Sequence, residues 1–181
     1  VYLGTFTIIP QIALSTREDY VGKEIKVRGS GFAASATVTI YFDGQQVGTA
    51  TTSSAGVFTE VTAAVPASSW GSHTIRATDT GNNEATATFN TKHSLAINPT
   101  SGTAGTRVTV TGTGFAADVD ITITFAKTQV TTAPPSVRTG SNGGFTGVFN
   151  VPPVSAGSHQ VEASDGTHSD GKAFTVSASV S

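Results

Sequence analysis

One stretch of the sequence occurs twice, and this repeat most constrains the fold. Residues 107–115 read Arg-Val-Thr-Val-Thr-Gly-Thr-Gly-Phe, and residues 24–32 read Glu-Ile-Lys-Val-Arg-Gly-Ser-Gly-Phe. In both copies apolar and polar side chains alternate, which is typical of a β-strand with one buried face. A Gly-x-Gly-Phe sequence then closes the run, which indicates a bulge or a tight corner at the end of the strand.

The spacing of the repeat divides the chain into domains. The phenylalanines that close the two copies are 83 residues apart, and this offset grows by about four where the second copy carries extra residues between later phenylalanines. Insertions of this kind fall in loops. We therefore predict a duplicated domain, with the first immunoglobulin-like repeat over residues 11–92 and the second over residues 93–181, joined near residues 92–94.

Each copy contains about seven short segments with strand character, separated by turns rich in glycine, asparagine, aspartate and proline. In the first copy we expect strands at residues 11–15, 23–30, 36–43, 45–51, 57–64, 72–79 and 84–91. In the second we expect them at residues 94–98, 106–113, 119–126, a short one within 128–139, then 144–150, 158–165 and 171–177. The pattern predicts an all-β chain with almost no helix, built as two tandem immunoglobulin-like β-sandwiches.

The first ten residues belong to neither copy. Shifted by the same 83 positions, residues 4–8 fall on the last expected strand of the first copy, so we expect an extra N-terminal strand over residues 1–10. One interpretation is the remnant of a longer array, left as a tail or folded onto its own domain. The other is a donor strand that pairs with an open sheet edge of a neighbouring chain. The candidate assembly residues, which make both faces of this segment fairly apolar, are Val1, Tyr2, Leu3, Phe6 and Ile8.

The amino-acid composition limits the classes of partner that we expect for this chain. The net charge is −2, and charged residues make up 12% of the chain, compared with about 25% in average domains. Without a cluster of Lys and Arg, a nucleic-acid partner is not expected. No apolar run approaches the roughly 20 residues of a membrane helix, so we expect no membrane span in this chain. The low charge and the abundance of Thr and Ser favour an extracellular or cell-surface location.

The sequence offers no catalytic constellation, and we predict no catalytic residue and no cofactor. His73 and His159 occupy equivalent Gly-Ser-His positions, but each is alone in its domain, whereas zinc needs three or four ligands. We interpret both as packing or capping residues. The glutamates are scattered, so no carboxylate pair of the kind that hydrolyses sugars is indicated.

Asp118 and Asp120 are weak candidates for a calcium site. Two positions apart on a strand, they would share a face and could bind Ca²⁺ together with nearby carbonyl groups. The equivalent residues of the first copy, Ser35 and Thr37, are not carboxylates. We therefore interpret the pair as solvated turn residues and predict no metal site.

Trp70 is the single tryptophan of the chain, in a loop where the second copy has Ala156. Its amphipathic ring suits an interface or a sugar ring, and it also suits packing within its own loop. We name it as the candidate ligand or interface residue.

A family resemblance adds to this interpretation. Residues 98–115, Asn-Pro-Thr-Ser-Gly-Thr-Ala-Gly-Thr-Arg-Val-Thr-Val-Thr-Gly-Thr-Gly-Phe, with Ile-Thr-Ile-Thr-Phe at 121–125, resemble the opening of IPT/TIG-type domains. Residues 151–161 and 173–176 also resemble the bacterial versions. The first copy departs from the pattern at residues 15–20, and we interpret Arg17 and Glu18 in this segment as a solvated loop. The resemblance implies immunoglobulin-like folds, found in tandem in prokaryotic cell-surface proteins, and a non-enzymatic module.

The function predicted from the sequence is structural. We expect a building unit of a surface layer, fibre or adhesin stalk, whose main partners are other copies of itself joined by edge-strand addition. The alternative is a carbohydrate-binding or spacer module of a secreted multidomain enzyme, with polysaccharide as its partner. A third interpretation is an adhesin that binds a partner protein through loops such as 128–144.

Overall fold

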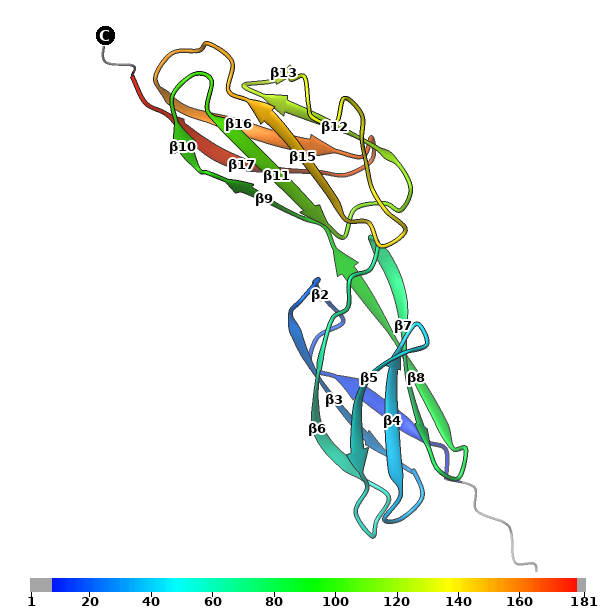
Figure 1. Cartoon of the computed structure of the whole chain (residues 1–181). Coiled ribbons are helices and arrows are strands. Elements are labelled where there is room, and N and C mark those ends of the chain that lie inside the picture. The colour runs from blue at the N-terminus through cyan, green and yellow to red at the C-terminus, as the bar shows by residue number, and fades with distance from the viewer. Residues whose placement is uncertain (1–7, 179–181) are drawn as a thin grey trace, which may run out of the picture. The chain divides into compact units, whose positions relative to one another are not determined.

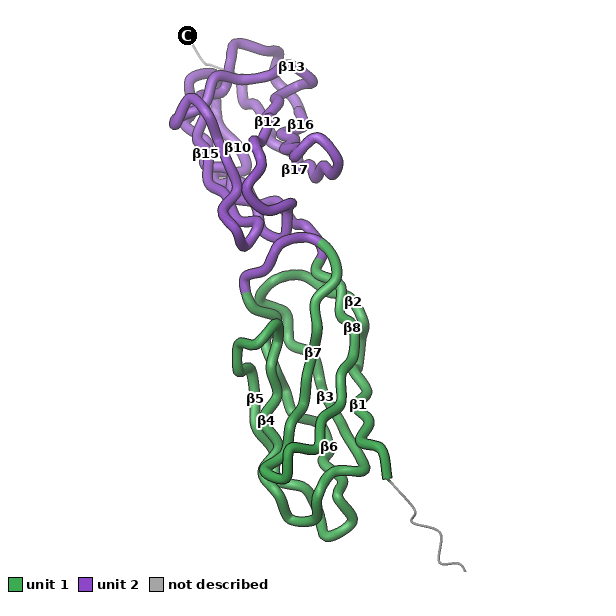
Figure 2. Tube along the Cα trace, turned by 90° about the vertical axis from the view of Figure 1, so that its right-hand side faces the viewer, with its two compact units in different colours: residues 1–66, 71–91 green, residues 67–70, 92–181 purple. Residues whose placement is uncertain are grey.

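The computed structural model describes residues 8–178, and within that range it contains strands, turns and loops but no helix. The described chain forms two compact units, shown in different colours in Figure 2. Unit 1 comprises residues 8–66 and 71–91, and unit 2 comprises residues 67–70 and 92–178. Each unit is a sandwich of two β-sheets, which confirms the predicted fold class.

Unit 1 packs a three-stranded sheet against a five-stranded sheet (Figure 1). The order in the first sheet is β1 (Gln11–Leu14), β3 (Glu24–Ser30) and β6 (Phe58–Ala64). The order in the second is β2 (Glu18–Tyr20), β8 (Glu84–Lys92), β7 (Gly71–Asp79), β4 (Thr37–Phe42) and β5 (Gln45–Thr51). Neighbouring strands are antiparallel in the first sheet and from β8 to β5 in the second.

Unit 2 repeats this arrangement with a changed edge (Figure 1). Its three-stranded sheet has the order β9 (Ser94–Asn98), β11 (Arg107–Thr113) and β15 (Phe145–Asn150). Its second sheet has the order β10 (Ser101–Gly102), β17 (Ser169–Val176), β16 (Gly157–Ser164), β12 (Asp120–Phe125) and β13 (Thr128–Gln129), with β14 (Val137–Arg138) also paired to β12.

Alternation along the strands builds one core in each unit. The repeated strands β3 and β11 bury every second side chain, as the sequence predicts. Phenylalanines supply much of the volume, and because each is large and apolar, its burial stabilises the fold. The phenylalanines that are almost completely buried are Phe89, Phe115, Phe125, Phe149 and Phe174.

The two glycines of the Gly-x-Gly-Phe sequence do not both form the predicted corner. Gly112, the first glycine, is an ordinary residue of strand β11, and a Cβ on it would lie 2.0 Å from Cε1 of Phe145. The glycine therefore makes room for a phenylalanine ring from the neighbouring strand. The second glycine, Gly114, has a φ of +68° and turns the chain, so the predicted bend is right for this position only.

Two short strands, β2 and β10, were not predicted. Arg17 and Glu18 are exposed, as expected, but Glu18 begins the strand β2, which pairs with β8, so the predicted loop is wrong from this residue on. The Asn90 N–H donates to the carbonyl oxygen of Arg17 at 2.8 Å and holds this segment against the sheet. The single strand expected within 128–139 is divided into β13 and β14.

The predicted N-terminal strand lies mostly outside the described residues. Of its candidate assembly residues, Val1, Tyr2, Leu3 and Phe6 fall outside, and Ile8 is described. Residues 8–10 form no strand. The side chains of Ile8 and Ile9 are 65% and 73% exposed.

Within residues 8–178, no helix is long and apolar enough to cross a membrane.

Candidate interaction sites

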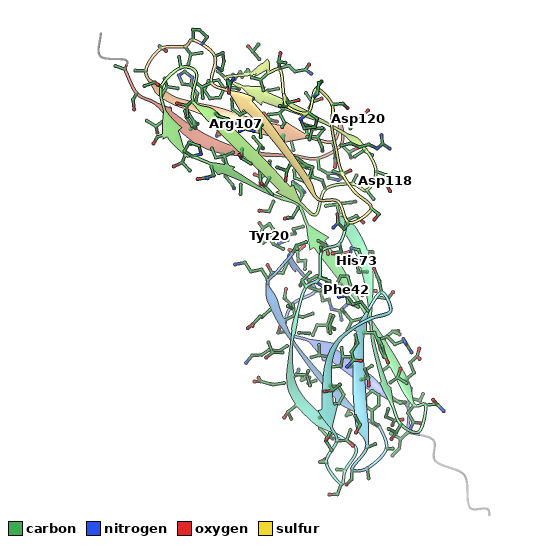
Figure 3. The ribbon with its side chains drawn as sticks, viewed as in Figure 1. Tyr20, Phe42, His73, Arg107, Asp118 and Asp120 are labelled. Atoms are coloured by element: carbon green, nitrogen blue, oxygen red, sulfur yellow. The ribbon has the colours of Figure 1, made fainter. Side chains whose placement is uncertain are left out.

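Asp118 and Asp120 lie on the surface of unit 2 and do not share a strand face (Figure 3). Asp118 is in a turn with a φ of +55°, whereas Asp120 begins strand β12, so the predicted pairing on one strand is wrong. Their cationic neighbour is Arg138, whose guanidinium donates to Oδ1 of Asp120 at 3.3 Å and to the carbonyl oxygen of Asp118. The guanidinium already places a positive charge beside these oxygen atoms, and Ca²⁺ would have to displace it in order to bind. No group of three or more His, Cys, Asp or Glu within the described residues could hold a metal ion.

Trp70 lies in the segment Ala67–Trp70, which packs with unit 2. Its indole ring stacks on the imidazole of His168, with ring centroids 4.1 Å apart and an interplanar angle of 32°. Its backbone N–H donates to the carbonyl oxygen of Phe115 at 2.9 Å. The residue remains 49% exposed, so the stack covers part of the ring and leaves the rest in water.

Asp165 supports the histidine of this stack. Its carboxylate lies 3.1 Å from Nδ1 of His168 and accepts the backbone N–H groups of Ala116, Thr167 and His168 at 3.0, 2.9 and 2.7 Å. Burial raises the pKa of Asp165, but these hydrogen bonds favour the charged carboxylate and together lower the pKa to about 2. The bond to Ala116 also ties the turn between β16 and β17 to the corner that follows β11.

Asp79 makes the equivalent hydrogen bonds in unit 1. Its carboxylate accepts the backbone N–H of Ala33 at 2.7 Å, across 46 residues, and the N–H groups of Gly81 and Asn83 in its own turn. Burial raises the pKa of Asp79, but the hydrogen bonds outweigh it and lower the pKa below its ordinary value. The sequence alone does not reveal this long-range tie in either unit, because the donors, Ala33 and Ala116, lie 46 and 49 residues from their aspartates.

His73 and His159 are packing residues in equivalent places. Their rings lie against Phe42 and Phe125, with centroids 4.9 and 5.5 Å apart; Figure 3 labels the first pair. Nδ1 of His73 is 2.6 Å from Oδ2 of Asp43, and Nε2 of His159 hydrogen-bonds to a loop carbonyl at 2.8 Å. Each imidazole therefore packs on a buried phenylalanine with its ring and hydrogen-bonds to a loop group with one of its nitrogens.

The two units differ most at the gap between their sheets, beside the edge strands β5 and β13. In unit 1, β5 is seven residues long, and no strand in the described part of the chain pairs with its outer side. In unit 2, β13 has two residues, and the chain then crosses the gap. Ala133 exchanges two backbone hydrogen bonds with Val148 of β15, at 2.7 and 3.1 Å.

The corresponding gap in unit 1 is an open groove. Its volume is about 840 Å³, and it is lined by residues 49–53 and 57–62. Val57 is 37% exposed there, and the one charged residue of the lining, Glu60, is paired with Lys26 at 2.9 Å. The sequence carried a signal for this difference, because the four extra residues of the second copy fall where its own chain crosses the gap.

Comparison with known domain families gives two matches. The IPT/TIG domain matches residues 19–94 and residues 93–176. Together these matches cover most of the chain and agree with the resemblance noted in the sequence. Among curated proteins, no sequence matches the chain.

Several solved structures align loosely with the chain. The adhesin InvE of Yersinia pseudotuberculosis is 15% identical, with a TM-score of 0.40, over 93% of this chain and 59% of the adhesin chain. The D00-D0 domain of intimin is 15% identical, with a TM-score of 0.39, over 94% of this chain and 100% of the domain. The gamma-CGTase of alkalophilic Bacillus clarkii is 14% identical, with a TM-score of 0.37, over 93% of this chain and 26% of the enzyme. The chain thus spans 59% of the InvE chain.

Proposed function

The chain belongs to the IPT/TIG domain family, and from this premise we propose that it is a non-enzymatic structural module of an extracellular surface layer, fibre or adhesin stalk. Its units would self-associate by adding residues 1–9 of one chain to a sheet edge of another. Strand addition supplies a row of backbone hydrogen bonds and buries alternate side chains, so it can join modules that have no enzymatic site.

One observation carries the proposal. Ile8 and Ile9 are adjacent apolar side chains that are 65% and 73% exposed. They continue a seven-residue sequence, Val-Tyr-Leu-Gly-Thr-Phe-Thr, that contains no charged side chain. A run of this kind has high strand propensity and is unfavourable in water unless another surface covers it.

Other features support a structural role at a surface. The chain is poor in charge and has no cysteine, so a small sandwich must be stabilised by its core and by its contacts. The two buried aspartates, Asp79 and Asp165, hold backbone N–H groups and are thereby used for stability. An extracellular location fits the abundance of Thr and Ser.

Deletion of residues 1–9 tests the proposal. We expect the full chain to form oligomers by light scattering, with regular filaments or sheets in electron micrographs, and the deleted chain to remain monomeric. A full-length control with Tyr2→Ser, Leu3→Ser and Phe6→Ser keeps the backbone and removes the apolar side chains, so it should also assemble poorly. If the deleted chain formed the same oligomers as the full chain, the proposal would be wrong.

A second candidate function rests on Trp70. Because about half of this residue is exposed, it could stack on a sugar ring, as expected for a carbohydrate-binding module of a secreted enzyme. Titration with soluble polysaccharides, followed by tryptophan fluorescence, separates the two candidates. Saturable binding that is lost in Trp70→Ala would favour the carbohydrate module.

A further inference from the structure

We propose that the outer edge of β5, with the groove beside it, is the acceptor that receives residues 1–7 of a second copy of this chain. This inference rests on the proposed function and goes further, because it names the receiving surface. It is carried by four features of unit 1: the direction of its backbone groups, the absence of protective charge, the contrast with unit 2, and the match to the donor.

The backbone of β5 presents unused hydrogen-bonding groups. The Thr52 N–H donates to the carbonyl oxygen of Ala36 at 2.9 Å, which fixes the phase of the ladder between β4 and β5. Because paired and outward-facing residues alternate along an antiparallel strand, the N–H and C=O groups of Thr49 and Thr51 point away from β4. Both side chains are exposed, and no strand among residues 8–178 is hydrogen-bonded to that side.

The β5 edge lacks the features that usually block strand addition. Its sequence, Gln-Gln-Val-Gly-Thr-Ala-Thr, contains no charged residue and no proline. The strand on the other side of the groove, β6, is protected. A register shift in its pairing with β3 coincides with Glu60, which has a φ of +39° and pairs with Lys26 at 2.9 Å. The open edge of this groove is therefore that of β5.

In unit 2 the chain itself adds to the facing edge of the gap, that of β15, the counterpart of β6, and a groove of about 720 Å³ remains beside it. The chain crosses the gap between the sheets, and Ala133 is bound by two backbone hydrogen bonds to the edge of β15. Pro134 and Pro135 follow, and proline cannot extend a ladder. The gap between the sheets of unit 2 thus accommodates an extended, uncharged segment along one of its two edges. In unit 1 the chain between β5 and β6 is too short to supply one.

Residues 1–7 match this site in length, charge and pattern. The segment has seven residues, as β5 does, and neither carries a charged side chain. On an added strand, Tyr2, Gly4 and Phe6 would share one face, and Val1, Leu3, Thr5 and Thr7 the other. The aromatic face suits the groove, where Val57 is part of the exposed lining, and the other face is polar at its Thr5 and Thr7 end.

Proline at the outward-facing positions tests the acceptor. In Thr49→Pro/Thr51→Pro the lost N–H groups are not part of the β4 ladder, so we expect the circular dichroism spectrum to remain that of the folded chain. The matched control is Thr49→Ala/Thr51→Ala, which keeps both N–H groups. We expect the concentration at half-assembly to rise by about tenfold or more in the proline variant, since two hydrogen bonds are lost. It should stay near the wild-type value in the control. Equal assembly of the two folded variants would overturn the proposal.

A photocrosslink locates the donor and separates this inference from the proposed function. Benzoylphenylalanine replaces Phe6 in unlabelled chains, which are mixed with ¹⁵N-labelled chains, irradiated and digested. Mass spectrometry should find crosslinks between differently labelled chains that map to residues 45–51 or 57–62. If the chains assemble but crosslink elsewhere, the acceptor is wrong and strand donation stands. If deletion of residues 1–9 leaves assembly intact, the donor is wrong and both proposals fall. Crosslinks confined to single chains would show that the segment folds onto its own domain.

Discussion

Gly112 lies beneath the ring of Phe145, so close that a Cβ on the glycine would stand 2.0 Å from Cε1 of the ring. The same relationship recurs in unit 1, where a Cβ on Gly29 would stand 2.3 Å from Cε1 of Phe58. In both units the ring also contacts the phenylalanine that closes the repeated motif, with centroids 5.2 and 5.6 Å apart. Because the glycine has no side chain, an aromatic ring from the neighbouring strand can pack directly over its backbone.

We expect Gly112→Ala to destabilise unit 2 by about 1–3 kcal/mol, because the added methyl group overpacks the core against Phe145. Gly171→Ala in β17 is the matched control, since a Cβ there would meet its neighbours at ordinary contact distances of 3.5 Å and more. Urea unfolding followed by circular dichroism measures both. Equal stability of the two variants would mean that the ring moves aside without cost.

We expect Asp165→Asn to cost about 1–3 kcal/mol at neutral pH. The amide cannot accept the hydrogen bonds from Ala116, Thr167 and His168 as a charged carboxylate does. Asp120→Asn is the control, because Asp120 is exposed and its ion pair with Arg138 contributes little. Thermal unfolding of the variants should therefore differ clearly, and an equal loss in both would contradict the buried tie.

The same aspartates predict how stability depends on pH. The pKa of Asp165 is lowered to about 2 in the folded chain, and the pKa of Asp79 is also lowered. A lowered folded pKa contributes stability above the unfolded value, near 4, and that stability is lost as pH falls toward the folded value. The wild-type chain should lose stability between about pH 4 and pH 2. The slope should be smaller in Asp165→Asn, and parallel curves would rule out this source.

Removal of His168 should change the emission of Trp70. Since Trp70 is the single tryptophan and stacks on His168, the change His168→Ala should expose more of the indole ring. We expect emission to move to longer wavelength and quenching by acrylamide to increase. His159→Ala serves as the control, because His159 packs on Phe125 instead. Identical quenching in both variants would argue against the stack.

Calcium should have little effect on the wild-type chain. The guanidinium of Arg138 already neutralises Asp120 and occupies the carbonyl oxygen of Asp118. We therefore expect the midpoint of thermal unfolding to be the same in millimolar Ca²⁺ and in EDTA. Arg138→Gln frees both oxygen donors and should reveal any weak affinity. A clear stabilisation of the wild-type chain by Ca²⁺ would contradict this assignment.

The sequence predicts the sandwiches well because alternation and turn chemistry are local signals. Strands such as β3 and β11 alternate cleanly, and they appear within one residue of their expected ends. The strands β2 and β10 escape prediction because three and two residues are too few to show alternation. They exist because tertiary pairing to β8 and β17 supplies their hydrogen bonds.

The candidate sites are harder to predict, because they depend on residues distant in the sequence. Asp118 and Asp120 suggest a shared face only if both lie on a strand, and the turn at Asp118 prevents this. Arg138, which neutralises Asp120, lies 18 residues further along the chain. The unpaired edge of β5 can be identified only by comparing the two units in the structure, because no sequence motif distinguishes an unpaired edge strand from a paired one.

The Ala133–Val148 bridge has a consequence for growth. It pairs Ala133 with the edge of β15, and β13, the unit 2 counterpart of β5, has two residues, so under the proposal the seven-residue edge of β5 is the one acceptor of its length among the described residues. Under the proposed assembly each chain then has a valence of two, one donor and one acceptor, and a head-to-tail contact of this kind builds unbranched polymers with distinct ends. Such a polymer can be terminated chemically. A synthetic Val-Tyr-Leu-Gly-Thr-Phe-Thr peptide would cap only the acceptor end.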